Sequence, residues 1–185
     1  MTESASSSLS AQSTQQSQRY SANQDDWSQE SREAYAQILE RRGAVSPPFR
    51  ALIGSPEVAL QYEALSSLLW KGSVPAAVLE SLFLVISRRF HCDEQWRRHA
   101  PKAIAAQVPQ ESIDQIAQGQ VPDAPHNVRQ AILLAEHLLD GKKIPNAIWN
   151  EAAQTFGQKG LSEICAFLGA ASIVAMSINI QEVAD

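Results

Sequence analysis

The chain has 185 residues, of which 44% are hydrophobic, and this size suits one domain with a hydrophobic core rather than two. Its formal net charge of −5 argues against a nucleic-acid-binding protein, which normally presents a basic surface. Because its two cysteines give no disulfide framework and its N-terminus shows no secretory signal pattern, we expect a cytoplasmic protein in a reducing compartment.

Residues 1–30 form a segment rich in Ser and Gln. It holds nine Ser and six Gln but few apolar side chains. Such a segment cannot bury enough surface to offset the entropy lost on ordering. We therefore expect residues 1–30 to be a disordered tail and residues 31–185 to fold as one helical domain.

The rest of the chain shows helical periodicity interrupted by proline and glycine, without an alternating strand pattern. A first helix is expected from Gln29 to Arg41, and "VSPPFR" (45–50) is interpreted as a rigid connector. Ser55 and Pro56 begin the next helix, with the Ser55 hydroxyl as its cap. Further helices are expected over residues 76–87, 92–107, 109–119, 125–140 and 145–157, before a last apolar one. The sequence therefore predicts an all-α bundle of seven or eight helices.

The last apolar segment, "LSEICAFLGAASIVAMSINI" (161–180), is long enough to be tested as a membrane span. It carries Glu163 near its start and Asn179 near its end, and it is rich in small residues. Small residues favour close helix packing. We therefore expect a buried core or subunit-interface helix, no membrane span, and a homo-oligomer.

The stretch "LESLFLVISRRFHCDEQWRRH" (79–99) holds the candidate catalytic residues His99, Glu80 and Cys92. Cys92 and His99 are seven residues apart, close to two helical turns, so we expect them on one face with Gln95 between them. If the two helices pack antiparallel, Glu80 approaches His99. A histidine can move a proton near neutral pH, and a carboxylate in an apolar wall can serve as an acid or base.

Each candidate also has a structural alternative. Glu80 could pair with an arginine on a partly exposed face, Cys92 could be a small buried hydrophobe, and His99 could cap a carbonyl. Asp93 and Glu94 oppose a thiolate at Cys92. A metal site is not expected, because the sequence has neither a His-Glu-x-x-His pattern nor a Cys-x-x-Cys pair.

A local basic cluster, "RRF" (88–90) and "WRR" (96–98), lies in the same stretch. Arginine binds carboxylates bidentately, so Arg88 is a candidate for holding a substrate carboxylate, with a solvated face as the alternative. Trp96 and Gln95 are the other candidates for the wall of a small-molecule pocket.

The order of Glu80, Cys92 and "EQWRRH" (94–99) resembles the signature of the carboxymuconolactone decarboxylase and AhpD-like superfamily. Two flanking segments, "SPEVALQYEALSSLL" (55–69) and "FGQKGLSEI" (156–164), resemble neighbouring parts of that family. The positions that carry the resemblance are Glu80, Arg88, Cys92, Gln95, Trp96, His99 and Ala103. It covers about residues 31–182 and implies an AhpD-like helical bundle that assembles as trimers or hexamers.

The resemblance implies two possible activities. AhpD-type peroxidases use a Cys-x-x-Cys pair with a Glu and His proton relay, to which Cys92, Glu80 and His99 correspond. Gln95 stands where the second cysteine would be, so a dithiol cycle lacks its resolving thiol. The decarboxylases of the family act without a cofactor on a small lactone acid.

We therefore expect a cofactor-free, carboxymuconolactone decarboxylase-like enzyme. His99 would donate or shuttle a proton, Glu80 would orient it, and Arg88 would hold a substrate carboxylate. Two alternatives are an AhpD-like alkylhydroperoxidase that uses Cys92, and a non-catalytic oligomeric binding protein of the same fold. The state of the pocket around Glu80 and His99, open or filled by side chains, is expected to separate the enzymes from the binding protein.

Overall fold

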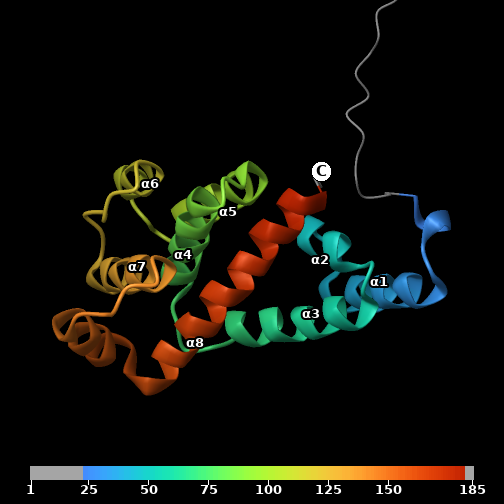
Figure 1. Ribbon diagram of the computed structural model, residues 1–185. Coiled ribbons are helices and arrows are strands. Elements are labelled where there is room, and N and C mark those ends of the chain that lie inside the picture. Colours follow the sequence, from blue (N-terminus) through green and yellow to red (C-terminus); the bar gives the residue numbers. More distant parts are fainter. Residues whose placement is uncertain (1–22, 182–185) are drawn as a thin grey trace, which may run out of the picture.

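The fold is built from helices throughout residues 23–181, the part of the chain that the computed structural model describes (Figure 1). Eight α-helices in this range confirm the expected all-α bundle. Residues 1–22 of the expected tail lie outside the described residues, while Gln24–Asp26 form a short 3-10 helix. The helices are α1 (Gln29–Arg42), α2 (Pro47–Leu52), α3 (Pro56–Trp70), α4 (Ala76–Arg89), α5 (Asp93–Ala105), α6 (Gln110–Ala117), α7 (His126–Leu139) and α8 (Asn146–Gln181).

Helix α4 lies at the centre of the bundle. Every residue from Val78 to Ser87 is buried, and the helix packs against α5, α6, α7 and α8. A helix buried on all sides must satisfy its polar side chains internally. Ser81 and Ser87 do so by donating to carbonyl oxygens one turn earlier, each at 2.7 Å. Glu80 therefore stands out as a buried acid that needs a partner from another helix.

Helix α8 runs diagonally in Figure 1 between the α1–α3 helices and the α4–α7 helices. It packs against α2, α3, α4, α5 and α7. Gly157 interrupts it with a non-helical backbone (φ 64°, ψ 178°), at the end of the helix expected over residues 145–157. Gly160 lies within the helical part that follows. Ile173, Met176 and Ile180 are exposed along one side, and we call these three residues the α8 stripe.

Helix α8 has the length and composition of a membrane span, but it is also partly buried in the fold. By length and composition the helix could cross a membrane, with a mean hydropathy of 1.9 in its most apolar window. Half of that window is buried inside the fold, and the core helix of a folded domain passes the same test. The apolar character of α8 is therefore weak evidence for a span.

Two local predictions were wrong. The segment "VSPPFR" is not a connector, because Pro47 and Pro48 begin the short helix α2. Proline is tolerated there, since the first helical N–H groups have no partner inside the helix. Ser55 does precede α3, with Pro56 at its first position, but the Ser55 side chain makes no capping hydrogen bond.

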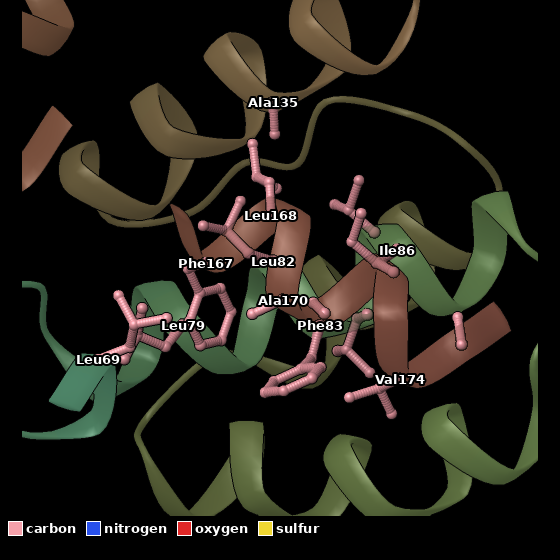
Figure 2. Close-up of a cluster of buried hydrophobic side chains, with 14 of the residues drawn as sticks. Leu69, Leu79, Leu82, Phe83, Ile86, Ala135, Phe167, Leu168, Ala170 and Val174 are labelled. Carbon is pink, nitrogen blue, oxygen red and sulfur yellow. The ribbon is translucent and has the colours of Figure 1, made fainter. Parts of the chain in front are cut away.

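The apolar core between α4 and α8 ends at an aromatic cluster that leads to the site. Figure 2 shows Leu82 and Phe83 of α4 beside Phe167 of α8. The Phe83 and Phe167 rings meet edge to face with centroids 4.8 Å apart, and Trp70 of α3 stacks on Phe83 at 6.1 Å. Phe83 thus links the core between α4 and α8 to the aromatic side chain of α3.

Candidate active site

Glu80 and His99 form a buried pair between α4 and α5. The three residues from Phe90 to Cys92 connect the helices, so that the chain turns back on itself. His99 Nδ1 lies 2.6 Å from Glu80 Oε2, and the two side chains are 12% and 7% exposed. The antiparallel hairpin thus brings Glu80 and His99 together, as expected for two helices that pack in this way. An exposed Glu80 bound to an arginine is ruled out.

The imidazole of His99 has a lowered pKa. Burial is the main cause, and the charges of Lys102 and Arg98 add to it, while the hydrogen bond and charge of Glu80 act in the opposite direction. Because of this lowered pKa the imidazole is neutral, and its contact with Glu80 fits the tautomer in which Nδ1–H donates to the carboxylate. Nε2 has no bond to the described residues and is not fully buried, so its lone pair is free to exchange a proton with a bound molecule.

An aromatic stack fixes the plane of the imidazole. The rings of His99 and Phe83 are 3.8 Å apart between centroids and inclined by only 17°. Phe83 in turn stacks on Trp70 with the same inclination. Because the ring face is covered and Nδ1 is tied to Glu80, the direction of Nε2 is set by the fold rather than by rotation of the side chain.

A cavity of about 310 Å³ opens next to this pair. Its size is at the small end of the range for binding sites of small molecules. Side chains from the α1–α2 segment, α3, α4, α5 and α8 contribute to its wall, so it is open rather than filled. The lining includes Arg42, Phe49, Tyr62, Trp70, Phe83, Gln95, Arg98, Lys102 and Ile178, besides Glu80 and His99.

Several of these lining residues were not predicted from the sequence. Arg98 and Lys102 could have been found, since they share the cavity-facing side of α5 with Gln95 and His99 at helical spacing. Arg42 and Tyr62 come from other helices, and no local pattern indicates them. Burial raises the pKa of Tyr62, whose hydroxyl donates to the carbonyl oxygen of Ala170 at 3.3 Å, so this side chain stays protonated.

Gln95 of α5 is a fully buried residue of the cavity wall. It is 0% exposed, and its Nε2 donates to the carbonyl oxygen of Ala171 at 3.3 Å. Its Oε1 has no hydrogen-bond partner among the described residues. The prediction of Gln95 as a residue of the pocket wall is compatible with this position.

Cys92 does not join the Glu80–His99 pair. It lies beside a second hollow of about 300 Å³, which Arg88, His91 and Trp96 also line. Cys92 precedes α5 with φ −101° and ψ 88°, so its backbone is not helical and the seven-residue rule does not apply to it. The expected common face of Cys92 and His99 was therefore wrong for a local geometric reason.

The Cys92 thiol is protonated at neutral pH. Burial raises its pKa, and the charges of Glu94 and Asp93 raise it further, while a backbone hydrogen bond from Gln95 opposes them. The side chain is buried, with 2% of the residue exposed. A thiol in such surroundings behaves as a small hydrophobe rather than as a nucleophile.

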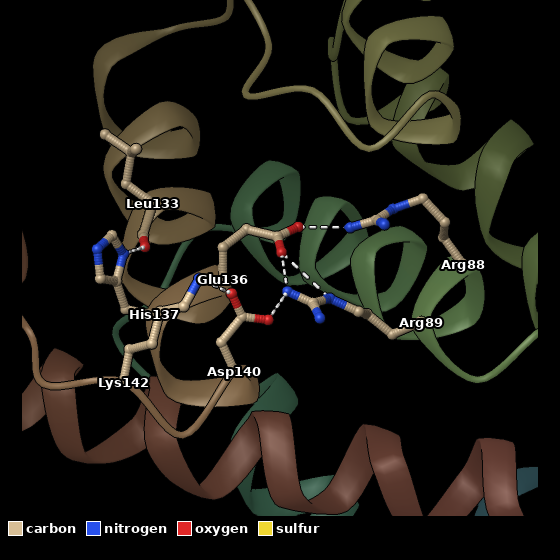
Figure 3. A network of polar contacts seen from close by, with 7 residues as sticks. All are labelled: Arg88, Arg89, Leu133, Glu136, His137, Asp140 and Lys142. Atoms are coloured by element: carbon tan, nitrogen blue, oxygen red, sulfur yellow. Dashed lines mark hydrogen bonds and ion pairs between the residues drawn. The ribbon is translucent and has the colours of Figure 1, made fainter.

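Arg88 is also placed away from the cavity. Figure 3 shows it reaching Glu136 of α7, with Arg88 Nη2 and Glu136 Oε1 2.5 Å apart. Arg89 binds the same carboxylate and also Asp140, at 2.6 Å. Arg88 lies eight residues after Glu80, which is about 12 Å along the helix axis. It joins α4 to α7, so Arg88 and Trp96, which lines the second hollow, are not part of the Glu80–His99 wall.

No group of three or more His, Cys, Asp or Glu side chains within residues 23–181 is placed to hold a metal ion. No protein-family model matches the chain, and no curated protein matches it. The resemblance to the carboxymuconolactone decarboxylase and AhpD-like superfamily therefore stays an expectation drawn from its residues.

Proposed function

We propose that the cavity beside Glu80 and His99 is the active site of a cofactor-free, carboxymuconolactone decarboxylase-like enzyme. The observation that carries the proposal is the buried Glu80–His99 pair at 2.6 Å, whose free imidazole nitrogen is accessible beside a cavity of about 310 Å³. A carboxylate that orients a histidine for proton transfer is a recurrent catalytic arrangement. The three basic side chains in the cavity wall suit an acidic substrate.

The proposed reaction has two steps. The bond between the lactone carbon and its carboxylate breaks, carbon dioxide leaves, and the electron pair stays on the conjugated ring as a dienolate. His99, which is neutral at rest, takes up a proton from solvent at Nε2, donates that proton to carbon and returns to its neutral form. Its lowered pKa makes the imidazolium a stronger acid than a free histidine. Glu80 keeps the imidazole oriented. It also stabilises the positive charge of the protonated ring, so burial lowers the pKa of His99 less than it would without Glu80.

The alternative of a thiol peroxidase has less support. It requires a thiolate at Cys92, but that thiol is buried and has a raised pKa. It also requires a second thiol for regeneration, and the neighbouring position holds Gln95. The alternative of a binding protein without activity is opposed by the open cavity beside the free nitrogen of His99.

Parallel assays of the same pure protein test the proposal. Carbon dioxide release from a set of unsaturated lactone acids is measured beside the consumption of an organic hydroperoxide with a thiol reductant. We expect turnover in the first assay and a loss of at least about tenfold in Glu80→Gln, which keeps the size of the side chain but loses its charge. Hydroperoxide turnover without decarboxylation would overturn the proposal in favour of the peroxidase.

A further inference from the structure

Three basic residues line the cavity, and two of them already bind carboxylates of the protein. Arg42 Nη1 lies 3.4 Å from Glu63 Oε1, and Arg98 Nε donates to Glu94 Oε1 at 2.6 Å. Lys102 differs from both, because no carboxylate among the described residues forms an ion pair with it. Its ammonium group is the cavity cation that remains available to a ligand.

One face of α5 contributes a row of residues to the cavity wall. Gln95, His99 and Lys102 lie at helical spacing on this face, and all three line the cavity. Exposure rises along the row, from 0% for Gln95 through 12% for the His99 side chain to the exposed Lys102. Lys102 is about 4.5 Å further along the axis than His99. Lys102 is therefore the most exposed residue of this row and lies about one turn from His99.

We propose that Lys102 is the specificity-determining residue of this cavity, where its ammonium binds the carboxylate of a small acid and places the acid against His99. The inference rests on the proposed function for the reaction, but the binding of the acid can be measured without turnover. An ammonium without an internal partner has no ion pair to break before it binds a carboxylate. Arg42 and Arg98, by contrast, would have to share or break their ion pairs with Glu63 and Glu94 before binding a ligand.

Binding at Lys102 also changes the proton affinity of His99. The pKa of the imidazole is lowered by burial and by the charges of Lys102 and Arg98, and Glu80 opposes these effects. A carboxylate bound to Lys102 offsets one of those charges and raises the pKa of His99 towards its ordinary value. His99 then takes up a proton from solvent, which prepares it as the donor. The other titratable side chains that line the cavity, Arg42 and Tyr62, have internal partners.

The test uses benzoate and its neutral counterpart benzamide as probes of the full-length protein. Calorimetry gives their affinities, and NMR of ¹³C-labelled histidine follows the titration of His99. We expect benzoate to bind more tightly than benzamide and to raise the pKa of His99, whereas benzamide leaves it unchanged. Lys102→Gln should lower the affinity for benzoate by about threefold to tenfold, the range of an ion pair strengthened by hydrogen bonds. The affinity for benzamide should not change.

Two further variants separate a binding role from a structural one. Lys102→Arg keeps the positive charge and should restore most of the preference for benzoate. Lys143→Gln removes the same charge from an exposed lysine outside the cavity wall and should behave as the wild type. In ligand-free Lys102→Gln, the pKa of His99 should be higher than in Lys143→Gln, because the nearby positive charge is gone.

Three results would overturn the inference: no binding of either probe, equal affinities for both probes, or equal behaviour of Lys102→Gln and Lys143→Gln. None of these bears on the Glu80–His99 proposal, which is decided by turnover in variants of those two residues. Conversely, a protein that binds benzoate through Lys102 but releases no carbon dioxide would lose the proposed reaction and keep the anion site.

Discussion

Replacing His99 should abolish most of the activity, whereas replacing Cys92 should not. His99→Ala removes the proposed proton donor, so kcat/KM for decarboxylation should fall at least about tenfold, the low end of what a general acid contributes. Cys92→Ser should keep most of the activity, because the thiol lies outside the cavity wall and is buried in the protonated form.

His99→Ala also affects stability, and the structure indicates by how much. The variant loses the ring that stacks on Phe83 and leaves the Glu80 carboxylate buried without its partner. Leaving a buried carboxylate without its partner in this way costs about 3–5 kcal/mol. In a domain of this size the thermal midpoint should fall by about 6–20 °C. Loss of activity in His99→Ala is therefore interpretable only below its own midpoint.

His99→Gln is the matched control for this effect. Its amide can donate to Glu80, so it should lose less stability than the alanine variant while losing the activity equally. Carbon dioxide release and the thermal midpoint are measured for the wild type and for the three variants. An inactive Cys92→Ser, together with consumption of organic hydroperoxide by the wild type in the presence of a thiol, would show the decarboxylase reasoning to be wrong.

Three other expectations can be measured on the purified protein. Deleting residues 1–22 should leave the thermal midpoint unchanged, but deleting 1–28 should lower it by at least about 2–4 °C, since it removes the Ser28 cap of α1 and the packing of Trp27 against the core. Light scattering at micromolar concentration should show an oligomer, and a charge placed in the α8 stripe should dissociate it; a wild-type monomer would contradict this. The free energy of unfolding should decrease as the pH falls below 6.5, because the unfolded chain then binds a proton that the lowered pKa of His99 denies to the folded one. This decrease should be smaller in His99→Gln.

The sequence predicted the helices and the central pair because both depend on local geometry. Proline and glycine mark most helix ends, so the bounds of α4 and α7 agree closely with expectation. Glu80 and His99 are similarly distant from the turn between their helices, so an antiparallel hairpin must bring them to the same height. The short connection between α4 and α5 was therefore sufficient to predict that Glu80 and His99 lie close together.

The failures concern residues whose position depends on contacts between distant parts of the chain or on a single non-helical residue. Arg88 is held by Glu136, which lies 48 positions later in the sequence, and no periodicity of α4 indicates that contact. Cys92 was assigned to a helical face although it is the residue before the helix. Arg42 reaches the cavity only because α1 packs against α3, which in turn packs against α8.

The position of Glu80 gives the strongest argument that the pair serves a reaction rather than stability. It lies in the most buried helix of the fold, among residues that are otherwise apolar or bonded to their own backbone. A buried carboxylate and its partner often contribute no more stability than apolar side chains of the same volume, because desolvation offsets the attraction. Core packing therefore gives little reason for an acid and a histidine at this point. A histidine oriented by that acid, with its other nitrogen accessible beside an open cavity, does provide a reason.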